Sequence, residues 1–278
     1  MRQHPWLGRL LWNLMVWAVV LTIAFPLFWI VSTALRPETE LFQRPPSLLP
    51  GTVTFEHFRR LVMDTPFPIY FRNSAIVALG TTLMVIIVGS LGAYSLSRFR
   101  YRGRGAIAKV VLLTYLMPSV VLFLPLYLIM AELGLVNSLF SLVLAYMTFA
   151  LPFALWLLRS FIDAIPVETE LAAMVDGASR MGAFFDVVLP QALPGIISTA
   201  LFTFILAWNE YLYALVLTNR DTEKPLPPGV ITMLTSSYNI EWALLMAASV
   251  LMSLPLILSF AFMQKHLTRG FGAGAVKG

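Results

Sequence analysis

The chain has 278 residues, of which 59% are hydrophobic and 12% are charged, and its mean hydropathy is +0.81. Soluble domains are about half apolar and about a quarter charged, so this chain has too few charged side chains to cover a water-soluble globule. The composition excludes a soluble enzyme and a disordered protein, and the lack of cysteine excludes a disulfide scaffold.

Six long windows of the sequence are almost free of charged side chains. A bilayer core about 30 Å thick needs roughly 20 apolar residues in a helix, and a helix satisfies its own backbone hydrogen bonds in lipid. The sequence therefore predicts an all-α, polytopic membrane protein that forms one domain over residues 1–278. The predicted transmembrane helices cover residues 11–34, 74–97, 110–131, 138–158, 191–217 and 242–264.

Arginine and lysine are unevenly divided between the connections. Twelve of the 19 lie in the N-terminal stretch, in the connections after the second and fourth spans and in the tail, and seven lie in the other connections. Because cytoplasmic loops are enriched in these residues, we expect a multi-pass protein of the cytoplasmic (inner) membrane with both termini in the cytoplasm. The basic cluster from Arg98 to Lys109 is then interpreted as a topological anchor, and no nucleic-acid partner is expected.

The connection between the fourth and fifth predicted spans, residues 159–190, begins with a short helix. Pro166 suits the first turn of a helix, and Glu168 and Glu170 lie near the positive end of its dipole. Three apolar residues spaced at i, i+4 and i+7 form a stripe of about two turns: Leu171, Val175 and Ala178.

The same connection turns back after that helix. Asp176-Gly177 is typical of a helix end or turn, and a second short helical stretch over residues 179–188 precedes Pro190. The small side chains of Ala172 and Ala173 let another surface approach the backbone. These features predict a helix–turn–helix that lies against the inner face of the membrane.

The spacing in this segment resembles the EAA loop of permeases in ABC-type importers: Glu-Ala-Ala, three residues, Gly, nine residues, Ile-x-Leu-Pro. Here it reads Leu171-Ala172-Ala173, three residues, Gly177, nine residues, Val187-Val188-Leu189-Pro190. Leu171 stands where the family has glutamate. Further segments are similar to carbohydrate-type permeases, and among them to the second, six-span permease of maltose-type systems: residues 72–74, 93–94, 98–99, 151–153, 208–211 and 274–278.

This resemblance implies the fold of a type I ABC importer permease, in which the loop forms a cytoplasmic coupling helix that docks on an ATPase. The implied partners are a second permease subunit, two ATPase subunits that hold ATP and Mg, an extracytoplasmic solute-binding protein and the lipid bilayer. The residues implied in ATPase coupling are Glu168, Glu170, Leu171, Ala172, Ala173, Asp176, Gly177, Ala178, Leu189 and Pro190. Lys277, in the glycine-rich tail, is implied to reach the ATPase interface.

The sequence contains no phosphate-binding or zinc-binding motif. A phosphate-binding loop needs Gly-x-x-x-x-Gly-Lys-Ser/Thr, and none of the four lysines is followed by serine or threonine. The histidines, at positions 4, 57 and 266, are far apart and form no zinc motif. We therefore expect no catalytic residue, no bound metal and no cofactor, and expect the chain to be a translocation subunit, not an enzyme.

Candidates for a solute pathway come from the fifth predicted span. Glu210 is the only acid within an apolar segment, and intramembrane acids are functional candidates; a structural role at a helix end is the alternative. Asn209 and Tyr211 could hydrogen-bond or stack on a sugar, whereas a membrane-surface aromatic girdle is the alternative for Trp208, Tyr211 and Tyr213.

Two other classes of membrane protein are weighed against an importer of a sugar or sugar-like solute. An ion-coupled secondary transporter would need ionisable residues deep in several spans and, in general, inverted repeats. An intramembrane enzyme would need His, Asp or Ser pairs within spans. The sequence shows neither pattern, and it does not specify which solute is carried.

Overall fold

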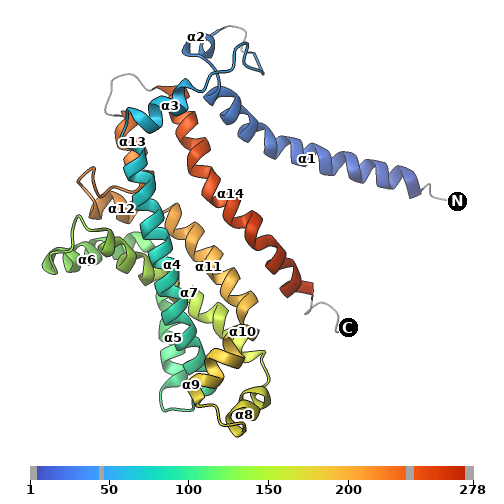
Figure 1. Ribbon diagram of the computed structural model, residues 1–278, viewed down its shortest axis with the longest axis vertical. Coiled ribbons are helices and arrows are strands. Elements are labelled where there is room, and N and C mark those ends of the chain that lie inside the picture. Colours follow the sequence, from blue (N-terminus) through green and yellow to red (C-terminus); the bar gives the residue numbers. More distant parts are fainter. Residues whose placement is uncertain (1–4, 44–46, 236–240, 273–278) are drawn as a thin grey trace. The chain divides into compact units, whose positions relative to one another are not determined.

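The computed structural model describes residues 5–43, 47–235 and 241–272, and every regular element within these ranges is a helix (Figure 1). The chain divides into two compact units. The first unit comprises Met1–Phe67 and Val230–Leu254, and the second comprises Pro68–Gly229 and Pro255–Gly278. The expectation of one domain over residues 1–278 stays a prediction.

Four continuous helices are long and apolar enough to cross a membrane: α1 (Pro5–Ala34), α4 (Phe67–Arg98), α7 (Leu139–Asp163) and α14 (Trp242–Gly272). They contain the predicted spans at 11–34, 74–97 and 242–264 and all but the first residue of the span at 138–158, so these four segments are helical as predicted. α7 begins where Ser138 accepts a hydrogen bond from the backbone N–H of Phe140, and it continues past residue 158 to Asp163. Apolar length alone thus located these helices, and at α7 the capping side chain of Ser138 marks the first turn.

The predicted span at 110–131 is a pair of helices, α5 (Arg104–Tyr115) and α6 (Ser119–Glu132), which meet at 101°. The segment passes as one span only as a bent pair, so the single continuous helix predicted there was wrong. Pro118 has no N–H for the helical ladder and pushes Met117 away from helical geometry, so the chain turns there and restarts with Pro118 as the N-cap of α6.

The fifth predicted span is also broken. The run α9 (Arg180–Ala183), the π-helix η1 (Phe184–Val188) and α10 (Leu189–Gln191) meets α11 (Leu193–Trp208) at 75°. α11 ends at Trp208, and α12 (Leu212–Leu217) is a separate short helix, so the single helix predicted over 191–217 was wrong. With each bent pair counted as one crossing, the described chain has up to six spans.

The long connection before α4 contains two short helices within the first unit, α2 (Glu38–Leu41) and α3 (Glu56–Met63). His57 is buried, and its Nε2 lies 2.8 Å from the backbone oxygen of Arg36. The Glu40 carboxylate accepts hydrogen bonds from the backbone N–H groups of Gly51 and Thr52. These contacts join α3 to the residues after α1, and α2 to residues 51–52.

In the second unit, α7 packs against both α5 and α11. α7 and α11 lie close together at Gly195, where an added Cβ would lie 2.4 Å from Cγ of Phe161. The first turns of α4 contact the segment that leads into α13 (Leu226–Thr235), because the Asn73 amide donates to the backbone oxygens of Thr222 and Lys224. α8 (Val167–Val175) and α9 lie together at one end of this unit (Figure 1).

Candidate functional site: the α8 segment and its supports

α8 is a short helix with two well-defined ends. Pro166 is its N-cap, and its last turn closes with a pair of hydrogen bonds, from the N–H of Gly177 to Met174 O (3.2 Å) and from the N–H of Ala178 to Ala173 O (3.0 Å). This is a Schellman arrangement, which requires a left-handed residue after the C-cap. Gly177 has φ = +98°, so glycine is the residue that fits there without strain. The turn predicted at Asp176-Gly177 is confirmed.

One face of α8 carries an apolar stripe on the surface of this chain. The side chains at i, i+4 and i+8 are 44%, 50% and 87% exposed at Val167, Leu171 and Val175. Glu168 and Ala172 are exposed on the same side of the helix, as is Asp176 at its C-terminal end. An exposed apolar stripe on so short a helix is typical of a contact surface.

The other face of α8 is held by a buried polar contact with α4. Glu170 is 4% exposed, and its carboxylate accepts a hydrogen bond from the Tyr94 hydroxyl and one of 2.9 Å from Arg98 Nε. Arg98 also donates through Nη2 to the backbone oxygen of Ile165, just before α8 (2.8 Å). Glu170 therefore joins α8 to the last turns of α4, and its carboxylate does not lie on the exposed face with Glu168.

A second polar contact joins α4 to the end of α7. The Ser97 hydroxyl donates to Asp163, whose other carboxylate oxygen accepts from Arg159 Nε at 3.3 Å. Because Asp163 and Ile165 flank the turn from α7 into α8, the last turn of α4 contacts both sides of that turn. These bonds fix where α8 begins.

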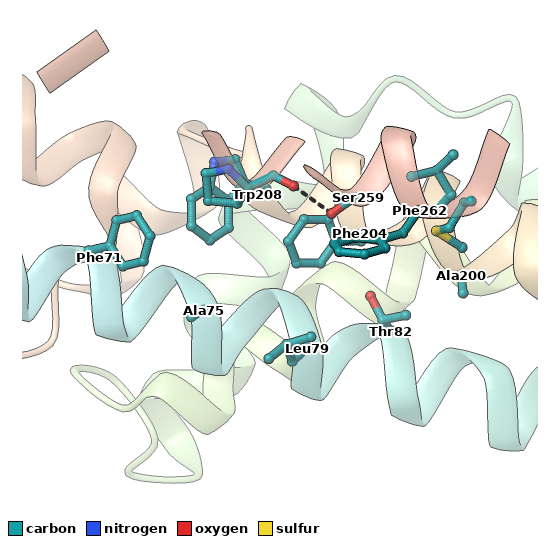
Figure 2. A pocket seen from close by; sticks show the side chains of 12 residues that line it. Phe71, Ala75, Leu79, Thr82, Ala200, Phe204, Trp208, Ser259 and Phe262 are labelled. Carbon is teal, nitrogen blue, oxygen red and sulfur yellow. Dashed lines mark hydrogen bonds between the residues drawn. The ribbon is translucent and has the colours of Figure 1, made fainter. Parts of the chain in front are cut away.

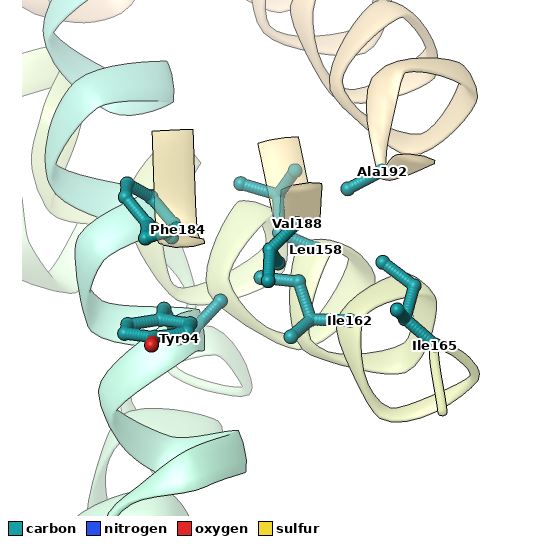
Figure 3. Close-up of a cluster of buried hydrophobic side chains, with 8 residues drawn as sticks. Tyr94, Leu158, Ile162, Ile165, Phe184, Val188 and Ala192 are labelled. Atoms are coloured by element: carbon teal, nitrogen blue, oxygen red, sulfur yellow. The ribbon is translucent and has the colours of Figure 1, made fainter. Parts of the chain in front are cut away.

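An apolar cluster lies next to the start of α8 and the end of α9 (Figure 3). We define it by its buried members: Ala93, Tyr94, Leu158, Ile162, Ile165, Phe184, Val188 and Ala192. The rings of Tyr94 and Phe184 lie 4.6 Å apart, and both residues are almost fully buried. The apolar cluster thus brings α4, α7, η1 and the bend before α11 into one packed group.

The remaining residues predicted for coupling lie around this group. Ala173 and Ala178 are half-buried, Leu189 packs on the apolar cluster, and Pro190 is exposed in α10. η1 has the wider turn of a π-helix, a feature that is frequent at functional sites. The predicted residues are therefore contiguous, but they divide into an exposed face and a supporting face.

The predicted pathway residues Asn209, Glu210 and Tyr211 form the break between α11 and α12. The Glu210 carboxylate accepts hydrogen bonds from the N–H groups of Tyr213 (2.9 Å) and Ala214 (3.2 Å), and the Tyr146 hydroxyl also bonds to it. The Asn209 amide donates to Ile205 O at the end of α11. Glu210 thus caps α12, which corresponds to the helix-end alternative, while the Tyr211 side chain is exposed.

A cavity of about 400 Å³ lies between α4, α11 and the second half of α14 (Figure 2). Aromatic and aliphatic side chains line it, among them Phe71, Phe204 and Trp208. Its two hydroxyl groups donate to carbonyls of their own helices, Thr82 to Ala78 O and Ser259 to Pro255 O. The cavity is therefore an apolar space, unlike a site built to hydrogen-bond a sugar.

Tyr94 and Arg98 are the functional candidates that sequence reasoning missed. Both stood in segments similar to carbohydrate-type permeases, but Arg98 was interpreted only as a topological anchor. Their partner Glu170 lies more than 70 positions away, so no spacing rule connects them. Lys277 lies outside the described residues. In the described part of the chain, no three His, Cys, Asp or Glu side chains are grouped to hold a metal ion.

The chain belongs to the family of binding-protein-dependent transport system inner membrane components, whose model matches residues 85–272. It is a permease subunit of an ABC importer and not an enzyme, which sets aside the ion-coupled alternative. It is 35% identical over 98% of its length to the diacetylchitobiose uptake permease DasC of Streptomyces coelicolor, of which it covers 98%. It is 34% identical over 95% of its length to the trehalose/maltose permease MalG of Thermococcus litoralis, of which it covers 96%.

The fold is that of a type I importer permease. A crystal structure of a bacterial ABC transporter involved in the import of the acidic polysaccharide alginate contains a chain with a TM-score of 0.83 to this one. The two are 22% identical, and the match covers 95% of this chain and 98% of that chain.

Proposed function

We propose that the chain moves a sugar or sugar-like solute across the cytoplasmic membrane by alternating access, and that α8 is the coupling helix through which separate ATPase subunits drive it. The observation that carries this proposal is the division of α8 into an exposed apolar face and a face tied to α4 by buried Glu170. A helix that transmits displacement needs a free surface for the motor and a rigid connection to the spans.

The partners we propose are a second permease subunit, two ATPase subunits and an extracytoplasmic solute-binding protein. ATP and Mg would be bound by the ATPase subunits. To reverse a 1:99 population of inward- and outward-facing states, nucleotide binding has to favour one state by about 5.5 kcal/mol. The contact at Leu171 would be apolar, because leucine stands where the family pattern has glutamate.

The carbohydrate class is supported by the relatives, since the diacetylchitobiose and the trehalose/maltose permeases match nearly the whole chain. We propose that both termini are cytoplasmic, which the charge distribution supports. At the solute pathway, Asn209 and Tyr211 would face the solute while Glu210 holds the backbone between α11 and α12. Lys277 would contact the ATPase from the tail.

Site-directed cross-linking tests the docking of α8. The chain lacks cysteine, so single cysteines at Leu171 or Val175 place a cross-linker on the exposed face. We expect both to capture an ATP-hydrolysing subunit in native membranes. Ala173→Cys, on the half-buried side of the same helix, is the matched control and should give much less product. Equal yields from the two faces, or none from either, would contradict the proposed docking.

A further inference from the structure

A buried arginine follows the first span. Arg36 is 2% exposed, its guanidinium lies 5.0 Å from the centre of the Trp29 ring, and its Nη2 donates to Ser32 Oγ (3.1 Å) and Ser47 O (2.5 Å). Its Nε is buried and has no hydrogen-bond partner among the residues that the structure describes. Within residues 5–43, 47–235 and 241–272, Arg36 forms no ion pair. A buried guanidinium that is not paired with an acid is costly, and a bound anion would stabilise it.

The nearby acid Glu40 is already engaged elsewhere. The hydroxyl of Thr52 and the backbone N–H of Gly51 donate to it, and these bonds, with a smaller effect of the Arg36 charge, hold the pKa of Glu40 below its usual value. Its carboxylate therefore stabilises the 51–52 turn and does not neutralise Arg36 by contact.

Arg36 lines a cavity of about 300 Å³ that lies wholly within the first unit. The walls include Trp29, Phe42, Trp242 and Thr33. The Thr33 hydroxyl is buried and, within the described part of the chain, also has no hydrogen-bond partner. Buried polar groups are almost always hydrogen-bonded. Two unpaired polar groups in one aromatic-walled cavity indicate a site for a ligand with acceptor oxygens.

The location of this cavity indicates which kind of anion it binds. Trp29 lies near the end of the candidate span Gly8–Ala34, and Trp242 is the first residue of the span Trp242–Gln264. Tryptophan is enriched where spans meet the lipid headgroups. The anion always present at that depth is the phosphate of a lipid, and the guanidinium of arginine matches phosphate geometry.

We propose that this cavity binds the phosphodiester of a membrane lipid headgroup. Arg36 and Thr33 donate hydrogen bonds to the phosphate oxygens, and the aromatic walls contact the carbons beside them. None of the residues that line this cavity belongs to α8 or to residues 209–211, so the proposal does not depend on how transport is driven.

Titration calorimetry on the complete transporter in a non-ionic detergent tests this site. The probes are dihexanoyl-phosphatidylglycerol, dihexanoylglycerol, which lacks the phosphate, and inorganic phosphate. We expect saturable binding of the phospholipid probe only. Arg36→Gln should weaken it about tenfold, the loss of a charged hydrogen bond. Arg59→Gln, which removes an exposed arginine of the same unit, should leave it unchanged.

Thr33→Val provides a second variant, because the Thr33 hydroxyl makes no hydrogen bond whose loss could unfold the protein. Thr33→Val should weaken phospholipid binding several-fold. It tests the site by itself if Arg36→Gln does not fold. Equal binding of dihexanoylglycerol, or unchanged affinity in Thr33→Val and Arg36→Gln, would overturn the site. Inorganic phosphate binding as tightly as the phospholipid would overturn the assignment to a lipid.

Discussion

Glu168 and Glu170 show how two acids in one helical turn acquire different functions. Glu168 is exposed, whereas Glu170 is buried against Tyr94 and Arg98. On the sequence alone both were assigned to the contact with the ATPase. The structure places Glu170 where its carboxylate can hold α8 but has no access to a partner.

Glu170→Gln tests this division of roles. The substitution leaves the buried Arg98 without its counter-charge, and removal of one member of a buried pair costs about 3–5 kcal/mol. We expect a loss of that order in the free energy of unfolding, measured by denaturant titration in detergent, together with impaired uptake. Glu168→Gln is the matched control in the same turn and should change stability by less than about 0.5 kcal/mol. A similar loss in both variants would contradict the structural role of Glu170.

At the scale of elements, the α7–α11 contact depends on a residue without a side chain. Gly195 lets α11 approach Phe161 so closely that a Cβ would lie 2.4 Å from its Cγ and 2.9 Å from its Cβ. Rotation of the ring cannot relieve the second contact. The position of the bend before α11 is therefore set by this approach as well as by the apolar cluster.

Gly195→Ala should separate α7 and α11 and destabilise the protein by about 1–3 kcal/mol, the typical cost of overpacking. The melting temperature of the purified protein reports this loss. Gly105→Ala, at a helical glycine with open space around it, should have no such effect. Addition of Phe161→Ala to Gly195→Ala should recover part of the stability, and a failure to do so would place the cause elsewhere.

Some helices and turns of this protein were predictable from the sequence and others were not. The long apolar helices and the turn at Gly177 were predictable, because each follows from local composition or from one backbone conformation. The bends at Pro118 and Ala192 were not, since proline occurs inside other helices here without breaking them, as at Pro152 in α7. The Glu170 contact was not predictable either, because it joins residues brought together only by packing.

At the scale of the whole molecule, the proposed coupling depends on which ends of the helices face the cytoplasm. The uneven distribution of arginine and lysine predicts that the α4–α5 connection lies inside the cell, because five basic residues lie in it and beside it between Arg98 and Lys109. It predicts that the α6–α7 connection lies outside. α8 then lies on the cytoplasmic side, as docking to an ATPase requires.

Single cysteines in the cysteine-free chain test this orientation. Tyr101→Cys and Leu133→Cys lie at exposed positions of the two connections and leave the basic residues intact. A membrane-impermeant maleimide should label position 133 in intact spheroplasts, and position 101 only after the membrane is opened. The reverse pattern would place the termini outside.

The contact of Tyr94, Arg98 and Glu170 has a consequence for how this sequence can vary among relatives. A charge reversal at position 170 would meet Arg98, whose ion pair within the described residues is with Glu170, so we expect it to be inherited together with a change at position 98. We therefore expect these positions to change in pairs over evolutionary time. The neighbouring exposed positions 168 and 171 should instead change together with the partner protein that they touch.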